Sequence, residues 1–92
     1  MNQGGSGAAT QIYSHRFDQR FFALPVEVQR RVQAKIDEVG QRLPSFPHYR
    51  MEGADTYRLR VGDYRIIYQI NQAKAELFLI ALGHRREIYK RS

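Results

Sequence analysis

The feature that most constrains the fold is a strict alternation of apolar and polar residues in the last third of the chain. From Thr56 to Val61, bulky apolar side chains alternate with threonine and arginine. A period of two indicates a β-strand with one buried face and one face in water. Gly62-Asp63 follows, and a two-residue loop with glycine first favours a type II′ hairpin turn. The run from Tyr64 to Ile70, rich in tyrosine and isoleucine, then completes a predicted hairpin.

The register of this hairpin follows by counting if Gly62-Asp63 is the whole loop. Arg60 then lies directly opposite Arg65, and Leu59 lies opposite Ile66. Like charges at directly opposed positions destabilise a sheet. A surface that binds an anion needs such a pair, whereas a fold does not. The alternative left open by the geometry is two solvated arginines splayed apart on an open sheet face.

Two helices are predicted before the hairpin. Phenylalanines four residues apart indicate a short helix within Phe17–Leu24, and Pro25 suits the first position of a second helix. From Val28 to Leu43, apolar residues recur at steps of three and four, which is typical of an amphipathic helix packed on a core. Strands are predicted at Gln11–Arg16, before the helices, and at Glu76–Leu82, after the hairpin.

The predicted fold class is therefore α+β, in the order β-α-α-β-β-β. Two N-terminal helices pack on one face of a small, mainly antiparallel β-sheet, and a basic C-terminal tail follows. Residues 1–10 are rich in glycine, serine and alanine and are predicted to be a flexible leader, with residues 11–92 forming a single domain. Residues 45–55 show no period and are predicted to form a loop. Within it, His48-Tyr49-Arg50 is either a base-stacking and phosphate-binding cluster or a surface loop with a chance aromatic.

The positive charge is concentrated on the predicted strands. The net charge is +6, from 15 Lys/Arg and 9 Asp/Glu. Residues 1–55 hold seven of the basic and six of the acidic residues, and residues 56–92 hold eight and three. Twelve of the cations are arginines, which bind phosphate through two parallel hydrogen bonds. Nucleic acid is the first partner that this pattern indicates, and an acidic protein is the second.

Other function classes find little support in the composition. The chain has no cysteine, so disulfides and thiolate metal sites are excluded. No apolar run approaches the ~20 residues of a membrane-spanning helix, and no signal peptide is visible. We expect a soluble, cytoplasmic protein with neither a membrane partner nor a bound metal.

Three segments together resemble the RelE branch of the RelE/ParE toxin superfamily of type II toxin–antitoxin systems. They are Tyr57-Arg58-Leu59-Arg60, the run from Gly62 to Tyr68, and Gly83-His84-Arg85-Arg86-Glu87-Ile88-Tyr89. Their order and spacing fit, and the resemblance covers about residues 11 to 91. It implies a toxin that cleaves mRNA in the ribosomal A site without a metal or other cofactor. The 2′-hydroxyl would attack the adjacent phosphate and leave a 2′,3′-cyclic phosphate. A cognate antitoxin would cover the basic groove.

The resemblance also implies which residues do the work. The positions that match the catalytic residues of the family are Arg60, Arg65, His84, Arg85 and Tyr89. Further RNA-binding residues are expected at Arg58, Arg86, Lys90 and Arg91. The reaction needs a base, cations for the phosphorane and an acid for the leaving oxygen. Arg65 and Arg85 are the natural phosphate clamp, and Tyr89 could stack on a base or orient the nucleophile.

The chain departs from the family in its candidate base. Some members carry lysine on the strand that here bears Arg58 and Arg60, and a desolvated lysine can lose its proton, whereas arginine effectively cannot. His84, whose unperturbed pKa is near 6.5, is the first alternative base, and Glu87 is the second. The competing interpretation of His84 is a surface histidine on a tail, and that of Tyr89 is an aromatic packed back on the sheet.

Two other functions compete with the ribonuclease. ParE-type toxins share the fold but act on DNA gyrase, and they typically lack the tail that His84 and Tyr89 supply here. The chain could also be a catalytically weak module that binds nucleic acid or an antitoxin through its basic face. Asp63 and Asn71 are interpreted only as turn formers.

Overall fold

The computed structural model describes residues 8–53 and 55–88. Within them, two helices and five strands follow one another along the chain. Their bounds are β1 Thr10–Tyr13, α1 His15–Phe21, α2 Val26–Gln41, β2 Tyr49–Arg50, β3 Tyr57–Val61, β4 Tyr64–Asn71 and β5 Glu76–His84. In this described part of the chain, neither helix is long and apolar enough to cross a membrane.

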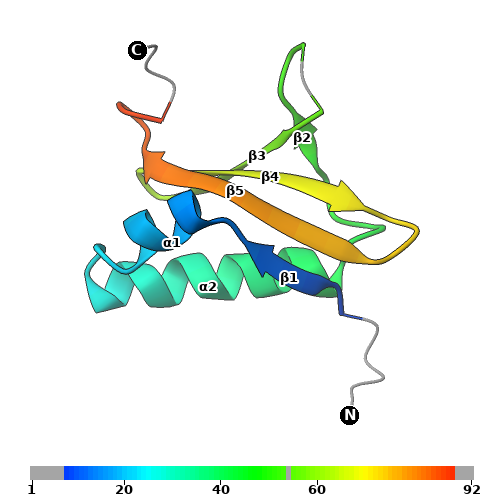
Figure 1. The fold of residues 1–92 in the computed structure, drawn as a ribbon, viewed down its shortest axis with the longest axis horizontal. Helices are drawn as coiled ribbons and strands as arrows, with labels where there is room; N and C mark the ends of the chain where they lie inside the picture. The colour runs from blue at the N-terminus through cyan, green and yellow to red at the C-terminus, as the bar shows by residue number, and fades with distance from the viewer. Residues whose placement is uncertain (1–7, 54, 89–92) are drawn as a thin grey trace.

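The five strands form one sheet in the order β1-β5-β4-β3-β2, and both helices pack on the same face of it (Figure 1). β1 runs parallel to β5, and the other neighbours are antiparallel. The predicted α+β class with a mainly antiparallel sheet is confirmed. We call the side covered by α1 and α2 the helix face and the other side the open face.

The predicted hairpin is present with the expected register. Arg60 pairs with Arg65, and Leu59 pairs with Ile66. Gly62 has φ +58°, and among the described residues the next position, Asp63, is not at positive φ. This is the pattern of a type II′ turn. The alternation places Leu59 in the core and leaves Arg60 exposed on the open face.

A β-bulge in β5 reverses the faces of its last residues. Tyr68 pairs with Leu79 and Ile67 pairs with Ala81, so Ile80 is the extra residue. Because of this shift, Leu79 and Leu82 both face the helices, although residues three positions apart point to opposite faces of a regular strand. Downstream of the bulge, the strand places Gly83 opposite Arg65 on the open face.

The bounds of the N-terminal elements differ from the predicted ones. β1 ends at Tyr13 rather than Arg16, because Ser14 is the N-cap of α1 and its Oγ accepts a hydrogen bond from the Phe17 amide at 2.9 Å. Pro25 is likewise the N-cap of α2 and not its first residue. The expected leader extended two residues too far, since Ala9 is 7% exposed in the core and Thr10 opens β1.

The strands also differ from the prediction in two places. Residues 45–55 were expected to form a loop, but a turn at Gly53, with φ +73°, returns the chain so that Tyr49 pairs with Arg58. This adds the short strand β2. The last strand continues beyond Leu82 to His84, because the β4 partners extend back to Tyr64.

The core lies between α2 and the helix face of the sheet. The predicted stripe on α2 is confirmed, since Val32, Ile36 and Val39 are each at most 1% exposed. Phe17 of α1 closes one end, and its ring stacks on Phe21 with centroids 5.8 Å apart.

An aromatic cluster seals the other end of the core. Tyr68 is completely buried, and its hydroxyl is 2.6 Å from Nδ1 of His48. The second ring nitrogen, Nε2, is 2.7 Å from the carbonyl oxygen of Leu43, which can only accept. His48 therefore donates from Nε2 and accepts from Tyr68 at Nδ1. Burial of the phenol, and next the neighbouring Tyr57, raise the pKa of Tyr68 above its ordinary value.

We expect Tyr68→Phe to lower the free energy of unfolding at pH 7 by about 1–3 kcal/mol, because Nδ1 of His48 loses its donor. The stability of the Tyr68→Phe variant should also fall less than that of the wild type as the pH becomes alkaline. Above pH ~10, the unfolded chain releases the Tyr68 proton while the folded chain keeps it. The unfolded state then binds fewer protons, and wild-type stability falls as the pH rises.

Urea midpoints between pH 7 and 11 measure both effects. Tyr49→Phe is the matched control, because Tyr49 is 65% exposed and makes no hydrogen bond through its side chain within the described residues. It should change stability by less than ~0.5 kcal/mol. If the urea midpoints of wild type and Tyr68→Phe fell in parallel above pH ~10, this would contradict the raised pKa of Tyr68.

Candidate nucleic-acid interface

The open face of the sheet carries a hollow whose lining, among the described residues, consists of arginines. Its volume is about 500 Å³, and its lining side chains belong to Arg58, Arg60, Arg65, Arg85 and Arg86. All five were predicted as site residues, so the fold gathers five of the nine predicted positions. We call this feature the arginine hollow. Five cations in one open depression are the arrangement that binding of a polyanion requires.

Arg58 and Arg60 form one side of the arginine hollow. They alternate with buried Leu59 on β3, and both are exposed. Within the described residues, neither side chain forms a hydrogen bond or ion pair with another protein group. Their donors are therefore available to a ligand.

Arg65 is buried, so the alternative of two solvated arginines splayed apart does not hold, whereas anion binding by this pair stays a prediction. The residue is only 8% exposed, although it lies opposite Arg60 on the open face. Its Nη1 donates to the carbonyl oxygens of Gly62 at 2.8 Å and Tyr64 at 3.0 Å. Burying a charge is costly unless it is hydrogen-bonded, and these carbonyls supply part of that compensation. The guanidinium is therefore held in one position before any ligand arrives.

The hairpin turn also positions Arg85. The Arg85 amide donates to the carbonyl oxygen of Asp63 at 2.7 Å, and its Nε lies 3.8 Å from Oδ1 of the same residue. Asp63 was interpreted only as a turn former, but it also ties the start of the tail to the hairpin. No local pattern links the two residues, which are 22 positions apart in the sequence, and only the pairing of β4 with β5 brings them together.

The chain turns back on itself after β5. The amides of Glu87 and Ile88 both donate to the carbonyl oxygen of His84, at 2.8 and 2.9 Å. Ile88 packs on Gly83, where an added Cβ would lie 3.2 Å from Cδ1 of Ile88. Glu87 forms an ion pair with Arg20 of α1 at 2.5 Å. These contacts fix the turn that carries Arg85 and Arg86.

His84 lies away from the arginine hollow. It pairs with Tyr64, whose ring lies on the helix face, and the two rings are in edge contact at 5.7 Å. It lines a different hollow, together with Leu24 and Glu87. Its Nδ1 accepts a hydrogen bond from the Arg86 amide at 3.1 Å. In this arrangement His84 holds the backbone of the turn and does not line the surface where the arginines gather.

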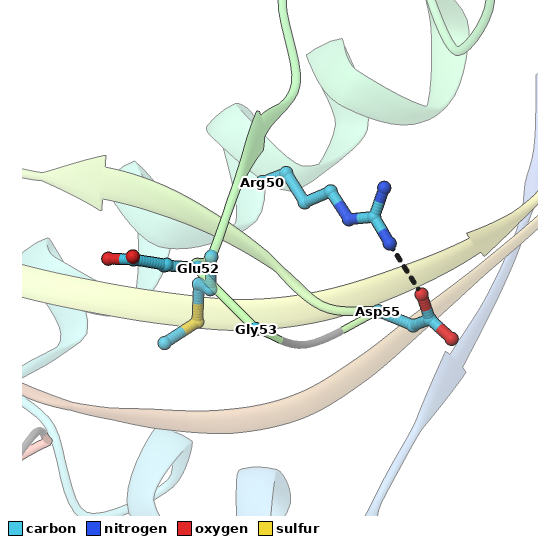
Figure 2. A pocket seen from close by; sticks show the side chains of 5 residues that line it. Arg50, Glu52, Gly53 and Asp55 are labelled. Atoms are coloured by element: carbon cyan, nitrogen blue, oxygen red, sulfur yellow. Dashed lines mark hydrogen bonds and ion pairs between the residues drawn. The ribbon is translucent and has the colours of Figure 1, made fainter.

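The three adjacent residues His48, Tyr49 and Arg50 do not form one cluster. His48 belongs to the aromatic cluster of the core, and Tyr49 is exposed next to Arg58. Arg50 reaches across the β2–β3 connection to Asp55, with Nη2 and Oδ1 2.8 Å apart (Figure 2). Neither sequence interpretation holds for all three residues together.

Three further predicted site residues, Tyr89, Lys90 and Arg91, lie outside the described residues. Within residues 8–53 and 55–88, no group of three or more His, Cys, Asp or Glu side chains is arranged to hold a metal ion.

The chain is similar to known toxins in sequence and in fold. The family model of the ParE toxin of type II toxin–antitoxin systems, parDE, matches residues 12–89. The archaeal RelE–RelB complex from Pyrococcus horikoshii OT3 is 25% identical, over 87% of this chain and 98% of that chain, with a TM-score of 0.71. The intact E. coli RelBE toxin–antitoxin complex is 26% identical over 84% and 96%, with a TM-score of 0.67. The isolated E. coli RelE toxin is 23% identical over 92% and 88%, with a TM-score of 0.71. A comparison with curated proteins gave no match.

Proposed function

Because this chain belongs to the ParE toxin family of type II toxin–antitoxin systems and has the fold of the RelE toxins, we propose that it is a ribosome-dependent endoribonuclease that cuts mRNA in the A site. The arginine hollow is the observation that carries this proposal. It offers several cations at one point, which is what a phosphodiester gaining charge during cleavage requires.

The proposed reaction is an in-line attack of the 2′-hydroxyl on the adjacent phosphate. The bond from the 2′-oxygen to phosphorus forms as the bond to the 5′-oxygen breaks, giving a 2′,3′-cyclic phosphate and a 5′-hydroxyl. Arg60, Arg65 and Arg85 would stabilise the phosphorane. Buried Arg65 suits this role best, because its position is fixed and its charge is poorly screened. The proposal needs no metal ion or cofactor.

The reaction also needs two proton transfers, one from the 2′-hydroxyl and one to the leaving 5′-oxygen. Groups other than the arginines must carry them out. Arginine stays protonated in proteins and cannot take the proton of the 2′-hydroxyl. His84, Glu87 and Tyr89 are the candidates from the sequence. In the described structure, His84 faces α1 rather than the arginine hollow, and Glu87 is paired with Arg20. We therefore propose that Tyr89 acts at the phosphodiester that is cleaved, and that His84 positions the turn after β5.

The other basic residues would bind the RNA backbone. Exposed Arg58 and Arg86 line the arginine hollow, and Lys90 and Arg91 continue the positive charge along the sequence. Each phosphate contact of this kind should make binding more sensitive to salt.

The proposed partners follow from the same resemblance. The similar structures include toxin–antitoxin complexes, so we propose that a cognate antitoxin covers the arginine hollow and silences the protein. The ribosome and its bound mRNA would be the target, and a cytoplasmic location is part of the same proposal.

Cleavage of mRNA on programmed ribosomes tests the proposed function. Purified protein should cut within the A-site codon and leave cyclic-phosphate ends. Inhibition of DNA gyrase is the second candidate, because the matching family model is that of the ParE toxin. Intact mRNA together with inhibited supercoiling would replace our proposal with gyrase inhibition. Intact mRNA and active gyrase would leave a binding module.

We expect His84→Ala to keep cleavage within about tenfold of wild type, because the ring lies outside the arginine hollow. A general acid or base typically accelerates a reaction about 10²–10⁴-fold. A loss of cleavage rate of that size would mean that His84 acts as an acid or base. The pH profile of single-turnover cleavage is the second readout. A positioning role leaves its shape unchanged, whereas loss of an acid or base removes one limb.

A further inference from the structure

A second hollow adjoins the arginine hollow at the edge of the sheet. Its volume is about 550 Å³, and it lies between the C-terminal half of α2 and β3. Arg58 and Arg60 line both hollows. The remaining lining residues are Lys35, Glu38, Arg42, Phe46, Pro47, Tyr49 and Leu59. A chain-like ligand seated in the arginine hollow can therefore continue into the second hollow past these two shared arginines.

Tyr49 presents an aromatic ring at this junction. It pairs with Arg58 across β2 and β3, and directly opposed residues share a sheet face, so Tyr49 lies on the open face. The residue is 65% exposed. Within the described residues its ring makes no aromatic contact and its hydroxyl no hydrogen bond. By contrast, the neighbouring ring of His48 is held by Tyr57 and Tyr68.

The other polar groups of the second hollow are already paired. Glu38 binds Lys35 at 3.2 Å and Arg42 at 3.0 Å. Both cations also lie over the ring of Phe46, at 5.9 and 5.5 Å from its centroid. This wall is preassembled, whereas the donors of Arg58 and Arg60 are unused within the described residues. What remains open is one aromatic ring next to two arginines.

We propose that Tyr49 is a stacking platform for an RNA base adjacent to the scissile phosphate, and that Arg58 and Arg60 bind the phosphate between the two hollows. The inference rests on the proposed function, since it extends the same RNA site. Single-stranded nucleic acid is bound elsewhere by this combination of a positive groove and exposed aromatic rings. An acidic peptide could form ion pairs with the arginines, but its carboxylates would not stack on the ring of Tyr49.

The first test measures binding of a short single-stranded RNA whose 2′-hydroxyl at the cleavage position is replaced by hydrogen, so that it cannot be cut. Tyr49→Ala should weaken binding about tenfold, since one base–aromatic stack is worth roughly that factor or more. Tyr49→Phe should bind like wild type, because the ring is kept. Phe22→Ala is the matched control, because Phe22 is 71% exposed and lines neither hollow.

An abasic nucleotide identifies the group that stacks. Removing the base next to the uncut bond should weaken binding to the wild type but hardly affect Tyr49→Ala. The two changes are then coupled, as expected of groups in contact. Additive losses would overturn the inference, and so would equal affinity of wild type and Tyr49→Ala.

Fluorescence gives an independent readout. The chain contains no tryptophan, so Tyr49→Trp introduces a single reporter. RNA should quench its emission, whereas a glutamate-rich peptide should not. Quenching by the peptide alone would assign the second hollow to a protein segment and overturn the inference.

Cleavage on programmed ribosomes separates the two proposals. If the wild type cuts mRNA while Tyr49→Ala binds the uncut RNA normally, only the stacking platform fails. If the wild type leaves ribosome-bound mRNA intact, the proposed function fails, whatever the Tyr49 variants do with free RNA.

Discussion

Replacement of Arg65 with alanine is expected to lower single-turnover mRNA cleavage on programmed ribosomes by about 10²–10³-fold, the usual loss on removing one preorganised donor to a developing negative charge. Both hydrogen bonds recorded for its guanidinium use Nη1. Nε and Nη2 make none within the described residues, so these nitrogens are left for a phosphate oxygen. The cation is also 8% exposed, which strengthens its interaction with an anion in the arginine hollow.

A second variant separates this catalytic role from the structural one. Arg65→Lys keeps the charge, but a single ammonium cannot bind the carbonyls of Gly62 and Tyr64 and also fork onto a phosphate. We expect it to recover less than a tenth of wild-type cleavage. Urea midpoints show whether either variant is unfolded under assay conditions. Lys74→Ala, in the exposed turn after β4, is the control and should cut normally. Normal cleavage by folded Arg65→Ala would remove Arg65 from the mechanism.

The hairpin could be predicted in detail because its information is local. Alternation over Thr56–Val61 set the buried face, and Gly62-Asp63 set the loop length. A two-residue loop leaves one register, and the observed pairing of Arg60 with Arg65 follows from it. The apolar stripe on α2 could also be predicted, because a helix of 16 residues repeats its apolar pattern several times.

The faces of β5 could not be predicted. The run from Leu77 to Leu82 is apolar throughout, so it contains no alternation that would reveal the bulge at Ile80. The face occupied by Gly83 and His84 depends on that one extra residue. For this reason the sequence could group His84 with the arginines, while the fold turns it toward Tyr64.

Contacts between residues that are distant in sequence account for the other differences between prediction and structure. His48 is separated by 20 residues from Tyr68, its hydrogen-bond partner, and no periodicity links the two. Arg65 lies on β4, between β3 and β5, and is buried, whereas Arg60, opposite it on β3, stays exposed. Identical residue types on one face thus received different environments from tertiary structure alone.

The largest effect on stability is expected from Phe17→Ala. Phe17 is 1% exposed, and its ring contacts those of Tyr13 and Phe21 at 5.4 and 5.8 Å. Truncating a buried phenylalanine leaves a cavity and typically costs about 3–5 kcal/mol, a large share of the ~5–15 kcal/mol that stabilises a domain. Chemical unfolding should show the loss as a lower urea midpoint with an unchanged m-value.

Phe22→Ala makes this prediction specific to burial. It removes the same atoms five residues later, but from a side chain that is 71% exposed, and should cost less than ~0.5 kcal/mol. Since α1 supports β5 from the helix face, on the side away from the arginine hollow, folded Phe17→Ala should still cut mRNA at close to the wild-type rate per folded molecule. Equal losses of stability in the two variants would contradict the described packing of α1. Loss of cleavage in fully folded Phe17→Ala would mean that α1 positions the reactive groups as well as the core.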